Sequence, residues 1–265
     1  MKQFALSSFA LTAAAGIAAT AGAQAYPQAR PYPGVGTPVV RAPAPAMEQQ
    51  RENGPQTGSV ISRPAAFTGP AANAANWEIG PIIRGKSRSD GMPLRPTQAG
   101  AEAGGGWSFD FPGPSARNGH VNYVTMPVQS LANARRITMT YRIDAGRGVQ
   151  FHPQEYPGTP GTMSLYFQVR GDNWTARDQY RFARWYAPWE KVVRLSPGTH
   201  TVSIDMDENW TAVVAFKRDT APDEFRSALA NAGRVGFTFG GKGGRGHGVY
   251  ATGPARFTLL DFRVE

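Results

Sequence analysis

Short runs of alternating apolar and polar residues recur through the C-terminal two thirds of this chain. In the run at 163–170 the odd positions hold apolar side chains, whereas the even positions hold Tyr166, Gln168 and Arg170. Successive side chains of a β-strand point to opposite faces of the sheet. The run therefore predicts a strand with one face in a hydrophobic core and a polar, aromatic face turned outward.

Further runs of the same kind are separated by turn residues such as Pro197-Gly198. We predict strands at 107–111, 120–126, 137–144, 163–170, 179–186, 192–195, 199–206, 212–216, 235–239 and 257–264. A single helix is predicted at 222–232, where a proline and two acids open the segment and Gly233 follows it. One late helix between strands argues against a parallel βαβ architecture. The predicted fold class is all-β, an antiparallel β-sandwich of jelly-roll type with one short connecting helix.

The first 75 residues differ in composition from the rest of the chain. Residues 1–25 carry Lys2, an apolar stretch and a small-x-small sequence at 23–25, which predicts an export signal. Residues 26–75 hold nine prolines and no long period, which predicts a disordered linker before a domain at 76–265. No second long apolar run predicts a membrane span. The chain has no cysteine to carry a lipid anchor, so we expect a periplasmic or secreted protein.

The formal net charge of +9 comes mainly from arginine, with 23 Arg against 5 Lys. Arginine binds carboxylates, sulfates and phosphates with a planar set of donors, so an acidic polymer is one partner that this composition favours. The charges are scattered along the chain, however, and a scattered charge also serves solubility alone. Nucleic acid is not expected, because the chain shows no nucleic-acid-binding motif.

Aromatic residues are densest between 166 and 189, where arginine and glutamine alternate with them. A sugar ring packs its C–H face on an aromatic ring, while its hydroxyls need planar donors and acceptors. We therefore predict a glycan-binding groove lined by Tyr166, Gln168 and Arg170, together with Arg181 and Trp185 from the run at 179–186. The alternative is that these aromatic residues pack in the core or at a sheet edge.

Two further segments supply candidate contacts. An acid followed by Asn-Trp-Thr occurs twice and places Trp174 and Trp210 in predicted turns. A tryptophan in such a turn either anchors it from inside or touches a ligand, and we assign Trp174 to the groove. The glycine-rich segment at 240–248 lacks the Ser or Thr of a phosphate-binding loop and predicts a β-loop. Its His247 is assigned to the border of the groove.

The stretch from Gly198 to Glu265 resembles the second half of the jelly-roll domains grouped as carbohydrate-binding modules and galactose-binding-like domains. The resemblance is carried by His200 to Ile204, Asn209-Trp210-Thr211, Phe225, Ala228 to Ala232 and Leu259 to Phe262, and by Trp77-Glu78 at the start of the domain. It implies non-catalytic binding of a polysaccharide or envelope glycan. It also implies a structural calcium held by Glu78 and Asp261, although the usual ending of the last strand differs here.

Two other classes of function stay open. A polysaccharide lyase acting on a uronate polymer needs a base close to an arginine, and His152, Tyr166, Arg170 and Arg181 are the candidates. Hydrolysis by the Asp205 and Asp207 pair is less favoured, because the motif of the sandwich glucanases is missing. A structural protein that binds an envelope or matrix partner is the third class. The sequence shows no complete catalytic set, so we predict a binding protein rather than an enzyme.

Overall fold

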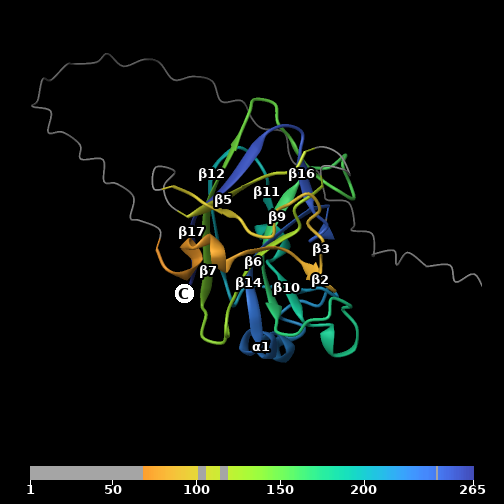
Figure 1. Ribbon diagram of the computed structural model, residues 1–265. Coiled ribbons are helices and arrows are strands. Elements are labelled where there is room, and N and C mark those ends of the chain that lie inside the picture. Colours follow the sequence, from red (N-terminus) through yellow and green to blue (C-terminus); the bar gives the residue numbers. More distant parts are fainter. Residues whose placement is uncertain (1–67, 101–105, 114–118, 243) are drawn as a thin grey trace, which may run out of the picture. The chain divides into compact units, whose positions relative to one another are not determined.

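Two antiparallel sheets dominate the computed structural model, which describes residues 68–100, 106–113, 119–242 and 244–265 (Figure 1). The larger, eight-stranded sheet runs in the order β1-β6-β14-β9-β10-β13, with β11 beside β9 and β15 beside β14. Its strands are β1 (Glu78–Gly80), β6 (Tyr123–Pro127), β9 (Thr162–Val169), β10 (Arg184–Tyr186), β11 (Val193–Arg194), β13 (Thr211–Ala212), β14 (Ala232–Gly241) and β15 (Gly244–Arg245).

The smaller, five-stranded sheet runs in the order β12-β7-β17-β5-β4. Its strands are β4 (Thr97–Gln98), β5 (Trp107–Asp110), β7 (Arg136–Ala145), β12 (Gly198–Asp205) and β17 (Ala255–Val264). Two small ribbons pair β2 (Ile82–Ile83) with β3 (Lys86–Ser87) and β8 (Phe151–Pro153) with β16 (Val249–Ala251). Short 3-10 turns are η1 (Pro70–Ala72), η2 (Ala74–Asn76), η4 (Asp178–Tyr180) and η5 (Trp189–Lys191). The all-β sandwich predicted from the alternating runs is confirmed.

Aromatic rings from both sheets meet in the core. The rings of Trp107 on β5 and Phe237 on β14 stack 6.3 Å apart, and Phe237 lies 5.2 Å from Phe257 on β17. All three side chains are fully buried. Burial of one such side chain stabilises the fold by roughly 1.5–3 kcal/mol, so this layer holds the two sheets face to face.

The folded domain begins earlier than the predicted boundary at 76. Ala71 and Ala74, which we had placed in the linker, are buried in the core. The Ala71 carbonyl accepts hydrogen bonds from the indole N–H groups of Trp77 and Trp107, at 2.8 and 3.2 Å. Residues 70–76 are therefore part of the packing around these two tryptophans. The predicted export signal and residues 26–67 of the linker lie outside the described residues.

One long predicted strand is only half a strand. The run at 179–186 divides into η4 and the three-residue β10, because the chain turns at residues 181–183. Just before the run, Asp178 has a left-handed backbone with φ 51°. The predicted helix is confirmed as α1 (Pro222–Ala230), which ends before β14 begins at Ala232. Within the described ranges, no helix is both long and apolar enough to cross a bilayer.

Candidate functional site

Three tyrosines form a cluster on the face of the larger sheet that turns away from the core. Tyr123, Tyr166 and Tyr186, here called the tyrosine cluster, come from β6, β9 and β10, and Tyr166 lies directly opposite Tyr186 in the strand register. The Tyr123 ring lies 4.8 Å from that of Tyr166, and the Tyr166 ring lies 5.2 Å from that of Tyr186. The Tyr123 and Tyr186 hydroxyls share a hydrogen bond of 2.9 Å.

A buried ion pair stands beside this cluster. Arg184 Nε lies 3.0 Å from Asp172 Oδ2, and the two side chains are 9% and 0% exposed. The N–H direction at Arg184 Nε does not meet hydrogen-bond geometry, so this contact is ionic. Asp172 instead accepts hydrogen bonds from Gln168 Nε2 at 2.9 Å and from the Trp174 amide at 3.0 Å. One carboxylate thus ties β9, β10 and the loop after β9 together.

These contacts fix the position of Trp174. Its ring lies 4.9 Å from the Arg184 guanidinium and meets the Tyr123 ring edge-on at 5.2 Å. Its backbone is left-handed, with φ 67°, a conformation that bulky residues rarely adopt. Strain of this kind persists only where the surroundings impose it, and it concentrates at functional sites. Trp174 stays half-buried at the surface, so part of the indole faces solvent.

The electrostatics of the cluster favour neutral phenols. Burial raises the pKa of Tyr123 and Tyr166 well above the ordinary value, and burial likewise raises the pKa of Tyr186, although the charge of Arg184 opposes this. Burial opposes the charge of Arg184, but Tyr186 and Asp172 together raise its pKa. The tyrosines therefore stay protonated at neutral pH, which suits hydrogen bonding and not proton abstraction.

A groove of about 460 Å³ opens beside the cluster, and we call it the sheet groove. Gln168, Arg170 and Trp174, all predicted to bind a ligand, line it together. Glu78, Tyr123, Thr125 and Arg234 complete its polar wall. Arg234 Nη2 lies 3.3 Å from Glu78 Oε1, and Arg234 Nε donates to the Thr125 hydroxyl at 2.8 Å. Arg170 is exposed and donates to the Gln129 carbonyl at 2.9 Å.

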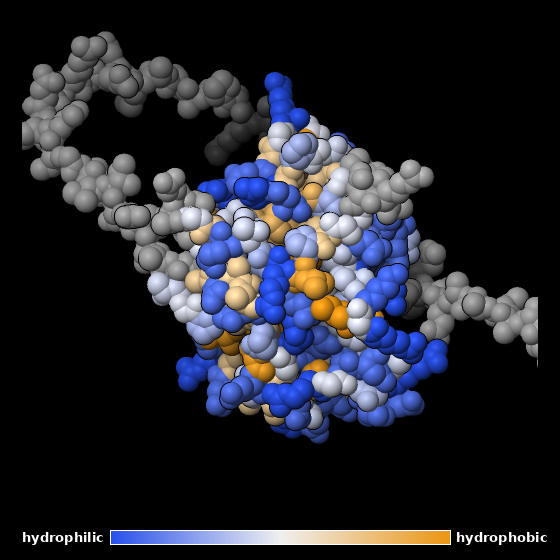
Figure 2. Space-filling view, in the orientation of Figure 1, coloured by the Kyte–Doolittle hydropathy of each residue, from blue (hydrophilic) through white to orange (hydrophobic). Residues whose placement is uncertain are grey.

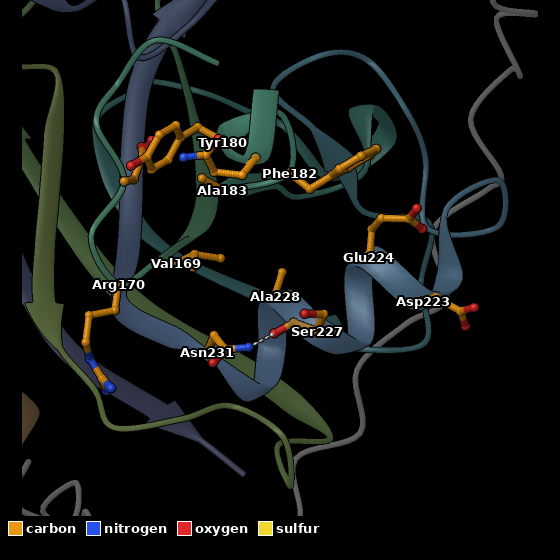
Figure 3. Close-up of a pocket in the computed structure, with 12 residues that line it drawn as sticks. Val169, Arg170, Tyr180, Phe182, Ala183, Asp223, Glu224, Ser227, Ala228 and Asn231 are labelled. Carbon is orange, nitrogen blue, oxygen red and sulfur yellow. Dashed lines mark hydrogen bonds between the residues drawn. The ribbon is translucent and has the colours of Figure 1, made fainter. Parts of the chain in front are cut away.

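A second groove of about 530 Å³, the helix groove, lies between α1 and the loop that precedes β10 (Figure 3). Val169 and Ala228 lie at the centre of the labelled set, with Tyr180 and Ala183 on one side and Ser227 and Asn231 on the other (Figure 3). Arg170 and the acids Asp223 and Glu224 also line it. On the face seen in Figure 2, hydrophobic residues form small groups among hydrophilic ones.

Part of the predicted site is wrong. Trp185 lies directly opposite Phe167, shares its core-facing side and is fully buried against Phe225 at 4.9 Å. Because the chain turns at η4, Arg181 leaves the strand face and its guanidinium lies 5.7 Å from the Phe216 ring. Tyr166 points away from the core, as predicted. The loop with Trp174 covers it, however, so this tyrosine is fully buried instead of exposed.

His247 lies apart from both grooves. Its Nδ1 is 2.6 Å from Glu155 Oε1, and it does not line either groove. The predicted calcium pair gains no support. Glu78 is bound by Arg234, and Asp261 lies 2.7 Å from Arg263 Nε in the other sheet. The described residues contain no group of three or more His, Cys, Asp or Glu suited to a metal ion.

Sequence reasoning missed the residues that order the site. Asp172 was noted only as the acid of an Asn-Trp-Thr repeat, and the other copy behaves differently, since Trp210 is fully buried. Arg184 and Tyr186 were assigned to the face away from the groove. In the structure both lie on the outward side of the larger sheet, opposite Gln168 and Tyr166.

Comparisons with known proteins give little beyond this geometry. A scan against models of protein families found no match, and neither did a search of curated proteins. Among solved structures two chains match, and one is described as "xylan-binding module CBM15". It is 13% identical to this chain, with a TM-score of 0.32 over 71% of this chain and 94% of its own length. The function of this chain therefore has to be argued from its own residues.

Proposed function

We propose that this protein binds a polysaccharide without transforming it, and that the sheet groove is the binding site. The observation that carries the proposal is the position of Trp174, half exposed at the groove and held by Asp172 and Arg184. Planar polar side chains, Gln168, Arg170 and Arg234, surround it. An apolar ring surrounded by planar donors and acceptors matches the two chemistries of a sugar residue.

Pre-organisation supports binding in this groove. Gln168 and the Trp174 amide are both held by Asp172, so neither loses much freedom when a ligand binds. Ordering a flexible side chain on association costs about 0.5–1.5 kcal/mol, and a groove that is already ordered avoids this cost. The predicted export signal makes the periplasm or the medium the expected location, and an envelope or environmental polysaccharide the expected ligand.

The lyase alternative has less support from the geometry. Tyr166, its candidate base, is fully buried and its pKa is raised by burial. His152 lies on β8 in a separate two-stranded ribbon, where its Nε2 is 3.2 Å from Gln150 Oε1. Arg181 lies over Phe216 and does not line the sheet groove. A base with access to substrate and an adjacent arginine are therefore not brought together by these residues.

Affinity electrophoresis in gels that contain soluble polysaccharides tests the proposal. We expect the protein to be retarded by at least one polymer and Trp174→Ala to remove most of that retardation. Arg194→Ala, an exposed arginine on β11 that lines neither groove, is the matched control and should migrate like the wild type. Retardation that survives Trp174→Ala would place binding elsewhere. New absorbance from unsaturated uronates would instead indicate a lyase, and co-purification of a protein with no polymer binding would indicate a structural role.

A further inference from the structure

The sheet groove and the helix groove meet where β9 ends. Val169, Arg170 and Asp172 line both of them. Trp174 stands in the first groove, and Tyr180 with Phe182 lines the second. The two hollows are thus neighbouring parts of one surface that runs from the outer face of the larger sheet, past Arg170, to α1.

The charge of this surface differs from that of the whole protein. In the sheet groove Arg170 and Arg234 balance Glu78 and Asp172, and each of these acids is paired with an arginine. In the helix groove Arg170 is accompanied by the acids Asp172, Asp223 and Glu224. Asp172 is paired with Arg184, and Asp223 is paired with Arg226. Neither groove therefore concentrates positive charge, although the chain carries +9. Like charges that face each other across an interface oppose association.

We infer that the two grooves form one binding surface for an uncharged polysaccharide, whose chain extends from Trp174 past Arg170 to Tyr180. This inference rests on the proposed function. It differs from the acidic polymer that the arginine-rich composition favours, because most of the arginines lie outside the two grooves. With no excess of positive charge in either groove, a uronate or sulfated polymer gains no electrostatic attraction there, while carboxylate oxygens of the helix groove can accept hydrogen bonds from neutral sugar hydroxyls.

Tyr180 is the residue that distinguishes the two grooves. It belongs to η4, lies half-buried and lines only the helix groove, whereas Trp174 lines only the sheet groove. A short oligosaccharide that stacks on Trp174 does not need Tyr180. A longer one reaches both rings, so its affinity should rise with chain length until the helix groove is filled.

The experiment has two arms. Affinity electrophoresis compares neutral polymers (xylan, glucomannan and mixed-linkage β-glucan) with anionic ones (alginate and polygalacturonate). Calorimetry then titrates oligosaccharides of the best neutral polymer, from disaccharide to octasaccharide, into wild type, Trp174→Ala, Tyr180→Ala and the Arg194→Ala control. We expect neutral polymers alone to bind. Tyr180→Ala should weaken the longest oligosaccharide about tenfold, the size of one aromatic contact, and leave the shortest unchanged.

The outcomes separate this inference from the proposed function. The inference would be overturned by a preference for alginate or polygalacturonate, or by an affinity of Tyr180→Ala that is unchanged for every oligosaccharide length. In either case, binding that depends on Trp174 would still support the sheet groove as the binding site. Binding of no polymer in either arm would overturn both. Substituting Glu224→Gln is a second check, since removal of one negative charge from the helix groove should increase the retardation by alginate if charge sets the preference.

Discussion

The hydroxyl of Tyr166 is the least satisfied group of the site. It is fully buried between two tyrosines that hydrogen-bond to each other, and it has no hydrogen-bond partner among the described residues. A buried polar group without a partner costs about 1–3 kcal/mol, whereas a formed hydrogen bond contributes about 1 kcal/mol. Two chemically identical substitutions within one cluster should therefore have different effects.

We predict that Tyr166→Phe leaves the free energy of unfolding unchanged or raises it by about 1 kcal/mol, because it removes an unpaired hydroxyl. Tyr186→Phe breaks the hydrogen bond to Tyr123 and should lower it by about 1 kcal/mol. Urea unfolding followed by tryptophan fluorescence measures both. Equal losses in the two variants would mean that the Tyr166 hydroxyl has a partner.

Asp172 should be the acid on which the site depends most. Asp172→Ala leaves the Arg184 charge buried and unpaired and frees Gln168 and Trp174, so we expect a loss of about 3–5 kcal/mol in the free energy of unfolding. Asp110→Ala breaks an arginine pair in which Asp110 is 65% exposed, and should cost less than about 1 kcal/mol. Similar losses from both variants in urea unfolding would contradict the central place of Asp172.

At the level of elements, the β14–β15 hairpin closes the second side of the tyrosine cluster. Arg245 on β15 lies 5.4 Å from the Tyr186 ring and 5.6 Å from the Trp189 ring. A Cβ at Gly246 would stand 1.9 Å from the Tyr123 hydroxyl, so the hairpin can lie this close only because residue 246 has no side chain. The cluster is thus enclosed by two loops, one on each side.

Gly246→Ala and Gly148→Ala form a matched pair. Both glycines are left-handed, with φ 77° and 82°, but a Cβ at Gly148 would meet no atom within 4 Å. Both variants bear the strain of a left-handed alanine, about 1–2 kcal/mol. Gly246→Ala must also displace Tyr123, and we expect a further loss of unfolding free energy and a changed near-ultraviolet circular dichroism signal. An unchanged tyrosine signal in Gly246→Ala would contradict the contact.

The strands that could be predicted are those in which the alternation of apolar and polar residues shows which side chains face the core. The run at 137–144 became β7 with Met139 and Tyr141 buried, Arg142 half-buried and Asp144 exposed, because side chains alternate between the two faces of a strand. The run at 179–186 failed because alternation does not reveal a turn in the middle of a run. Both sides of this run carry aromatic residues, so the pattern did not show which side faces the core, and Trp185 was placed on the wrong one.

At the scale of the molecule, the site could be predicted only where it lies on one continuous segment, β9 and the loop after it. Gln168 lies on β9, and Arg170 and Trp174 follow directly after its end. Arg234 comes from β14 and Glu78 from β1, which are brought beside β9 by strand pairing across most of the domain. No pattern local to these residues reports that pairing. The burial of Tyr166 beneath its loop is likewise a property of the assembled sheet.

Stability should fall in alkali. Burial raises the pKa of Tyr123, Tyr166 and Tyr186 in the folded state, and burial also raises the pKa of Tyr141. The unfolded chain releases these protons near pH 10, while the folded protein retains them. The contribution of these protonated tyrosines to the free energy of unfolding is therefore complete below a pH of about 10 and declines as the pH rises further. Urea unfolding at rising pH should show this slope, and Tyr166→Phe should make it shallower.

The place of β14 between β6 and β9 has a kinetic consequence. This strand, Ala232–Gly241, is the last of the larger sheet's long strands in the chain, yet it holds the two earlier ones together. Until it inserts, β9 presents an unpaired edge and an apolar side that includes Leu165 and Phe167. Sheets closed by such distant segments fold in about milliseconds to seconds. During that interval the nascent chain is open to intermolecular strand pairing, so low protein concentration and low temperature should raise the yield of refolding.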